Sequence, residues 1–180
     1  MDSIIKDPSL ATVGRQKIRW AKQHMKVLEG IAADFKQSRP FDGLTVVLSI
    51  HLEAKTAYLA QVLYQGGARV FATGSNPLST QDDVCAALAQ SGVHVYATHG
   101  CTQEEYKGYL CRALSQKPDV IIALGGGSAM DEAKFIGVAA KYDGDPWDFP
   151  TGKAALTDMI PVIAVVTIPA TSSELNGTAV

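Results

Sequence analysis

Apolar residues in the first part of the chain recur every three or four positions. The stripe comprises Ile18, Ala21, Met25, Leu28, Ala32 and Phe35. This spacing places them on one face of a helix, and Pro40 prevents the helix from continuing. The stripe is short for a coiled coil, so we predict one long N-terminal helix that packs against a sheet.

From Leu44 onward, short apolar runs alternate with helical patterns. Runs with the composition of strands buried on both faces cover 44–50, 69–73, 94–98, 120–124 and 162–168. Helices are predicted between them, over 56–65, from Ser79 to Gly92, from 102 to 115 and over 128–141. Repeated strand-helix-strand units predict an α/β fold: a Rossmann-like, doubly wound parallel sheet of about five strands, with helices on both faces.

Two helix starts carry the spacing of a capping box. Ser79 precedes Asp82 by three residues, and Thr102 precedes Glu105 by three residues. The stretch 142–159 is broken by glycine and proline and predicts a long surface loop, which is typical of functional segments. A length of 180 residues fits a single α/β domain over 1–180.

Composition favours a small-molecule ligand over a polymer or a membrane. The net charge is −2, without a basic run, so neither nucleic acid nor an anionic membrane is an expected partner. The three cysteines include no CxxC pair and indicate reduced thiols. We see no signal-peptide pattern and no apolar run of about 20 residues, and therefore expect a soluble, cytoplasmic protein.

The clearest chemical motif is Gly125-Gly126-Gly127-Ser128, where a predicted buried strand runs into a helix. Glycine lets the backbone approach a ligand, and the N–H groups at a helix start favour an anion such as phosphate. Ser128 is predicted to cap the helix and to donate to a phosphate oxygen, and Asp131 to brace the turn. Met130 departs from GxGxxG, and a tight turn without a ligand remains the alternative.

Other strand ends carry polar side chains that would meet at the same edge of a parallel sheet. The hydroxyls of Thr167 and Thr171 follow the fifth strand and are candidates for the same phosphates. His51, Thr56, Thr80 and Gln81 follow the first and second strands and suit a polar small molecule. From composition alone, a lone histidine in such a place is more often structural. The histidines have no partner at metal-ligand spacing, so we expect no metal site.

Residues 1–122 resemble the N-terminal, substrate-binding part of the S-adenosylhomocysteine hydrolase family. The resemblance lies in Asp7-Pro8-Ser9-Leu10-Ala11, in the segment 51–57 and above all in the segment 73–83, Thr-Gly-Ser-Asn-Pro-Leu-Ser-Thr-Gln-Asp-Asp. It implies an adenosine or homocysteine pocket that includes His51, Glu53, Thr56, Thr80 and Gln81. Beyond Ile122 we expect the resemblance to stop, because the Asp-Asp-Gly turn of that family is replaced by Ala123-Leu124-Gly125.

Residues from about 118 to 180 instead resemble iron-containing alcohol dehydrogenases of the butanol-dehydrogenase type. The matching parts are Gly125 to Ser128 with Asp131 and Lys134, the loop 142–148 and Thr167 to Thr171. In that family the glycine turn and these threonines hold the diphosphate of NAD(P). Its iron ligands lie in a later helical domain, and all four histidines of this chain precede the turn, so again no metal is expected.

We interpret the chain as a composite, hydrolase-like over 1–122 and dehydrogenase-like over 123–180. The predicted function is binding of NAD, NADP or adenosine by a hybrid domain that lacks a complete active site and is inactive alone. The alternatives are residual activity of either parent enzyme and a recombined structural domain without a selected ligand. Both parent enzymes assemble, which makes a homo-oligomer an additional expectation.

Overall fold

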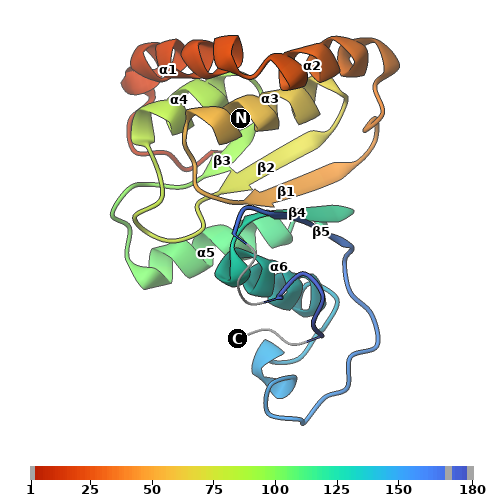
Figure 1. Cartoon of the computed structure of the whole chain (residues 1–180). Coiled ribbons are helices and arrows are strands. Elements are labelled where there is room, and N and C mark those ends of the chain that lie inside the picture. The colour runs from red at the N-terminus through yellow and green to blue at the C-terminus, as the bar shows by residue number, and fades with distance from the viewer. Residues whose placement is uncertain (1–2, 169–171, 178–180) are drawn as a thin grey trace.

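The computed structural model describes residues 3–168 and 172–177. Its centre is a parallel five-stranded sheet in the order β3-β2-β1-β4-β5 (Figure 1). The strands are β1 (Thr45–Ser49), β2 (Arg69–Thr73), β3 (His94–Tyr96), β4 (Val120–Gly125) and β5 (Val162–Val166). The chain moves outward from β1 to β3 and then returns to the other side of β1 for β4. The predicted Rossmann-like sheet is therefore confirmed.

In the described part of the chain, six helices cover the sheet: α1 (Ala11–His24), α2 (Lys26–Ser38), α3 (Ala54–Gln65), α4 (Asp82–Gln90), α5 (Gln103–Leu114) and α6 (Gly127–Ala139). Helices α3 and α4 lie on one face and α5 and α6 on the other, while α1 and α2 form an outer layer over α4 and α3 (Figure 1). The described residues also contain two single turns of 3₁₀ helix, η1 (Pro8–Leu10) and η2 (Pro146–Asp148). Helices on both faces were predicted, and the structure confirms them.

The middle strand, β1, is apolar because it is buried on both faces of the sheet. All five residues of β1 are buried, because β1 has a strand on each side and helices above and below. Val46 and Leu48 pack into the large core under α3 and α4, whereas Val47 joins a smaller cluster with Phe71 and Tyr109 beneath α5. Burial on both faces is what a continuous apolar run in a parallel strand indicates.

The N-terminal helical stripe is present as two helices. Met25 leaves the helical region, with φ −112° and ψ 62°, and α1 ends there while α2 begins. The bend lets α1 lie against α4 and α2 lie against α3, so that Ile18 and Ala32 are both buried. Since neither proline nor glycine stands at Met25, the sequence carries no signal for the interruption.

Of the two predicted capping boxes, one is confirmed and one is wrong. The Glu105 N–H donates to Thr102 Oγ1 at 3.2 Å and the Thr102 N–H donates to Glu105 Oε2 at 2.8 Å. Helix α4 instead begins after Gln81 without a side-chain cap. Ser79 Oγ accepts the N–H groups of Ser75 and Asn76 at 3.0 and 3.1 Å, so it closes a turn before the helix.

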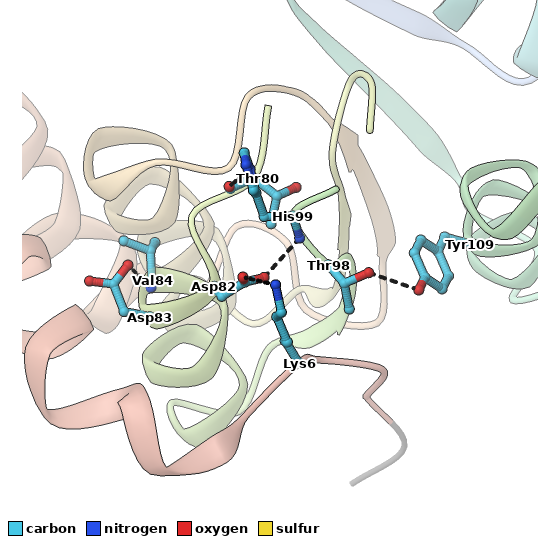
Figure 2. Close-up of polar contacts among 8 residues, drawn as sticks. All are labelled: Lys6, Thr80, Asp82, Asp83, Val84, Thr98, His99 and Tyr109. Atoms are coloured by element: carbon cyan, nitrogen blue, oxygen red, sulfur yellow. Dashed lines mark hydrogen bonds and ion pairs between the residues drawn. The ribbon is translucent and has the colours of Figure 1, made fainter. Parts of the chain in front are cut away.

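The N-terminal segment is attached to the outer edge of β3. The Ile4 N–H donates to the Val95 carbonyl at 2.8 Å, and the Ala97 N–H donates to the Ile4 carbonyl at 3.0 Å. Lys6 lies 3.4 Å from Asp82 at the start of α4, an ion pair drawn in Figure 2. Within the described residues, no helix has both the length and the apolarity to cross a membrane.

The predicted loop after α6 contains only the turn η2. Its aromatic side chains hold it together: Tyr142 packs edge-on against Phe149 at 4.7 Å between ring centroids, and its hydroxyl donates to Asp148 at 3.0 Å. Trp147 lies 5.9 Å from the Phe135 ring of α6 and is two-thirds exposed. The three cysteines are free thiols, with Cys85 buried and Cys111 exposed.

Candidate functional site

A cavity of about 700 Å³ opens at the carboxyl ends of β1 and β4. These are the two strands between which the chain direction across the sheet reverses. In an open parallel sheet the connections after two such strands diverge to opposite faces and leave a crevice, which is where ligands bind. The walls come from the β1–α3 connection, the β4–α6 turn and the α1–α2 junction.

The glycine turn forms one wall. Gly125 has φ +159°, and a Cβ at this position would lie 2.8 Å from the Ala129 Cβ, so a side chain cannot be accommodated without movement. Gly126 differs: its φ is −90°, and a Cβ there would meet only Ile168, at 3.9 Å. The backbone of Gly126 is therefore open to the cavity, whereas Gly125 is required by the turn itself.

The first turn of α6 is available to an anion. Gly126 is the N-cap residue and makes no side-chain cap, so the prediction that Ser128 caps this helix is wrong. The first N–H groups of a helix have no partners within the helix, and here they belong to Gly127, Ser128 and Ala129, which line the cavity. A phosphate would fit this arrangement of donors and helix dipole.

His51 connects the β1 end to the β2 end. Its Nδ1 lies 2.6 Å from Ser75 Oγ. His51, Ser75 and Asn76 all line the cavity, and the last two are cavity residues that the sequence prediction did not include. The contact places a polar pair in the same cavity as the glycine turn.

Glu53 and Thr56 also line the cavity, but their polar atoms start α3. Thr56 Oγ1 accepts the Glu53 N–H at 3.0 Å and donates to the His51 carbonyl at 2.6 Å. The Glu53 carboxylate pairs with Lys55 at 3.2 Å. These contacts fix the β1–α3 connection beside the cavity, and a direct role in binding stays a prediction.

Thr80 and Gln81 lie outside the cavity lining. Thr80 is buried, and its carbonyl oxygen is 2.9 Å from His99 Nδ1 (Figure 2). Gln81 Oε1 accepts from Lys17 of α1 at 3.2 Å. The turn closed by Ser79 directs this part of the chain toward α1 and the segment after β3, away from the glycine turn.

The remaining residues predicted to bind a cofactor are Asp131, Thr167 and Thr171, and each is found in a different place. Asp131 is buried and pairs with Lys134 at 2.9 Å, so it stabilises α6 behind the turn. Thr167 lines the cavity, and its N–H donates to the Gly125 carbonyl at 2.9 Å. Thr171 lies outside the described residues.

Sequence reasoning missed Glu132, a half-buried carboxyl in the cavity wall. The Tyr106 hydroxyl of α5 donates to its Oε1. Burial raises the pKa of Glu132, and the hydrogen bond from Tyr106 offsets part of that effect. Burial also raises the pKa of Tyr106, and the neighbouring carboxyl adds to it. The sequence did contain one signal for Glu132: it follows Ser128 by four residues, so both side chains lie on the same face of the helix.

Over 3–168 and 172–177, no three His, Cys, Asp or Glu side chains gather in a group that could hold a metal ion.

The sequence of residues 2–146 matches the S-adenosyl-L-homocysteine hydrolase family. The chain belongs to this family. The matched region extends past Ile122 and includes the glycine turn. The division of the chain into two segments at residue 122 stays a prediction.

Members of the S-adenosyl-L-homocysteine hydrolase family from archaea are close in sequence. The S-inosyl-L-homocysteine hydrolase of Methanopyrus kandleri is 46% identical over 169 residues, which is 89% of this chain and 40% of that protein. The adenosylhomocysteinase of Pyrococcus abyssi is 49% identical over 121 residues, 67% of this chain and 29% of that protein. The chain thus spans less than half the length of these hydrolases.

Solved structures similar to this hydrolase-family chain are alcohol dehydrogenases and an aldehyde reductase. The NADH-dependent butanol dehydrogenase A of Thermotoga maritima has a TM-score of 0.45 and 24% identity, over 84% of this chain and 33% of its own. The aldehyde reductase YqhD of E. coli has a TM-score of 0.46 and 28% identity, over 78% of this chain and 32% of the reductase. The family assignment rests on the sequence match.

Proposed function

We propose that the chain binds a nucleotide-type ligand, NAD(P), in the cavity between β1 and β4, with the diphosphate at the glycine turn. The observation that supports this most is the first turn of α6. It begins at the cavity without a side-chain cap, beside a glycine whose missing side chain leaves the backbone open. When bound, NAD(P) supplies hydride-transfer chemistry. The residues of this chain would hold its phosphates and ribose.

Adenosine, without phosphate, is a second candidate. Met25, Leu28 and Leu59 give the cavity an apolar wall that suits a purine base. The His51–Ser75 pair offers hydrogen bonds near the same wall. Membership of the S-adenosyl-L-homocysteine hydrolase family favours this nucleoside, and the Pyrococcus abyssi relative is an adenosylhomocysteinase.

Calorimetric titration of the purified monomer with NADH, NADPH and adenosine tests both candidates. For NADH we expect a dissociation constant in the micromolar to low-millimolar range. Ser128→Ala removes one donor and should weaken binding about five- to tenfold. Gly126→Val should abolish binding, because its side chain enters the cavity at a backbone conformation that valine tolerates. Ser38→Ala, at the end of α2, is the matched control and should change nothing.

Cooperative thermal unfolding must be kept in every variant, so that lost binding reports on the site and not on the fold. A folded protein that binds neither NADH nor NADPH would contradict the NAD(P) proposal. Adenosine binding would then support the second candidate. Absence of binding for all three compounds would favour a structural domain without a ligand, and turnover of a substrate would favour a residual enzyme.

A further inference from the structure

Glu132 is an acidic side chain of the cavity that phosphate binding at the glycine turn does not use. Glu132 and Ser128 stand four residues apart on α6 and line the same cavity. Side chains at this spacing have Cβ atoms about 5–6 Å apart. A ligand held at the first turn of α6 therefore extends within reach of the Glu132 carboxyl.

The carboxyl is fixed from one side only. Tyr106 reaches across from α5 and donates to Oε1, and this is the hydrogen bond that Glu132 makes among the residues described. Tyr106 is itself half-buried, so the contact restricts the rotamers of Glu132. No hydrogen bond to the second oxygen, Oε2, is found among the described residues, and Glu132 lines the cavity. A ligand that fills the cavity would displace water from this carboxyl, and a hydrogen-bond donor on the ligand would then stabilise the complex, since a polar atom removed from water without a partner is costly.

The anion site beside Glu132 restricts which ligand group can lie against the Glu132 carboxyl. A second phosphate near Glu132 would be repelled by the carboxylate. A hydroxyl group can donate to the carboxylate at no electrostatic cost. The arrangement therefore suits a ligand that has an anionic group at one end of a short segment and a free hydroxyl at the other, as in a ribose phosphate.

We propose that Glu132 determines the specificity of the cavity by accepting a hydrogen bond from a ligand hydroxyl, with Tyr106 as its positioning residue. The ligand class is then a phosphate ester of a polyol, such as the ribose phosphate of a nucleotide, and a bare anion is bound less well. This inference rests on the proposed function, because the anion at the glycine turn sets the distance to Glu132.

Two probes separate the hydroxyl contact from the anion contact. NADH carries both groups, whereas inorganic pyrophosphate carries the anion alone. We expect Glu132→Ala to weaken NADH binding about tenfold or more and to leave pyrophosphate binding equal or tighter. Glu132→Gln keeps an accepting oxygen and should recover part of the loss. Tyr106→Phe should weaken NADH binding by a smaller factor, and Glu104→Gln, an exposed acid on α5, is the control.

The possible failures are distinguishable. If wild-type protein binds NADH and Glu132→Ala binds it equally well, the role of Glu132 is refuted and the proposed function stands. Equal losses for NADH and pyrophosphate would also refute it, since they indicate damage to the cavity as a whole. If wild-type protein does not bind NADH, the NAD(P) function and this inference fall together. Thermal midpoints of all variants identify any that do not fold.

Discussion

Adjacent residues of the glycine turn are glycine for different physical reasons. Gly125 has a positive φ and no room for a Cβ beside Ala129, so it is required by the backbone. Gly126 has an ordinary φ and free space, so nothing in the fold demands a glycine there. A glycine without a structural reason, beside an uncapped helix start, is what a close backbone approach to a ligand would require.

The stability of the protein should depend on the protonation of Glu132. Below the ordinary pKa of 4.5, the carboxyl is protonated in both folded and unfolded chains. As the pH rises through the raised pKa of the folded protein, the folded state holds its proton longer, and the free energy of unfolding decreases. Glu132→Gln removes this dependence. We expect its thermal midpoint to exceed that of wild type at pH 8 and the difference to shrink toward pH 4.

Other ionisable groups lie nearby and are present in both proteins, so the difference between the two melting curves cancels their contributions. They lie on several elements: Tyr106 on α5, Cys101 before it, and His51, Glu53 and Lys55 across the cavity. Melting curves from pH 4 to pH 8 provide the measurement. A constant offset at all pH values would show that Glu132 does not titrate in this range. Glu104→Gln should follow the wild-type curve.

Candidate residues were predictable where the strand-end rule applies directly. His51, Gly125 to Ser128 and Thr167 lie at strand ends and do line the cavity. Thr80 and Gln81 satisfy the same rule but lie elsewhere, because the Ser79 turn carries them toward α1. Glu132 was missed because an acidic residue on an amphipathic helix indicates a solvated surface until the neighbouring Tyr106 is known.

Among the elements, the five strands were predicted because buried parallel strands are continuous apolar runs. Their ends were less accurate: β3 stops at Tyr96 and β5 at Val166, before the predicted Thr98 and Ile168. The division of the N-terminal helix at Met25 follows from packing on two different helices. Only tertiary contacts contain that information.

The contact between α1 and α4 depends on Gly14. A Cβ at Gly14 would lie 1.8 Å from the Asp83 carbonyl oxygen, so the two helix backbones touch. We expect Gly14→Ala to push the helices apart and to lower the free energy of unfolding by about 1–3 kcal/mol. Urea denaturation followed by circular dichroism measures this change.

Gly30 supplies the matched control within the same helical layer. It is exposed in the middle of α2, and nothing lies within 4 Å of the position of its Cβ. Gly30→Ala should therefore stabilise the protein by about 0.5–1 kcal/mol through helix propensity. The two substitutions should therefore change the free energy of unfolding in opposite directions, which tests the packing of α1 on α4 directly. Stabilisation by both substitutions would contradict the close α1–α4 contact.

At the scale of the whole molecule, the sheet is covered unevenly. Ile163 and Val165 of β5 pair with Ile122 and Leu124, which contact the core under α3 and α4. On β5 this face is open, and the two side chains are 51% and 43% exposed. An apolar strand at a sheet edge favours association with other chains.

We therefore expect the protein to associate as its concentration rises, and Ile163→Lys with Val165→Lys to reduce that association. The added charges repel each other across neighbouring copies and hydrate the strand face. Sedimentation velocity over a range of concentrations measures the effect. Val27→Lys, on an exposed position of α2, is the control. Association that persists in the double variant would place the contact on another surface.

The strand order also determines when this sheet can be completed during synthesis. The Thr45 N–H at the start of β1 is held by Asp119 Oδ2, from a residue 74 positions later. On the ribosome, β1 pairs with β2 while its other edge stays open until β4 has left the exit tunnel. An open edge of an apolar strand can pair with a foreign chain. Because the cavity forms at that same edge, no ligand bound there can protect the nascent chain before the glycine turn has been synthesised.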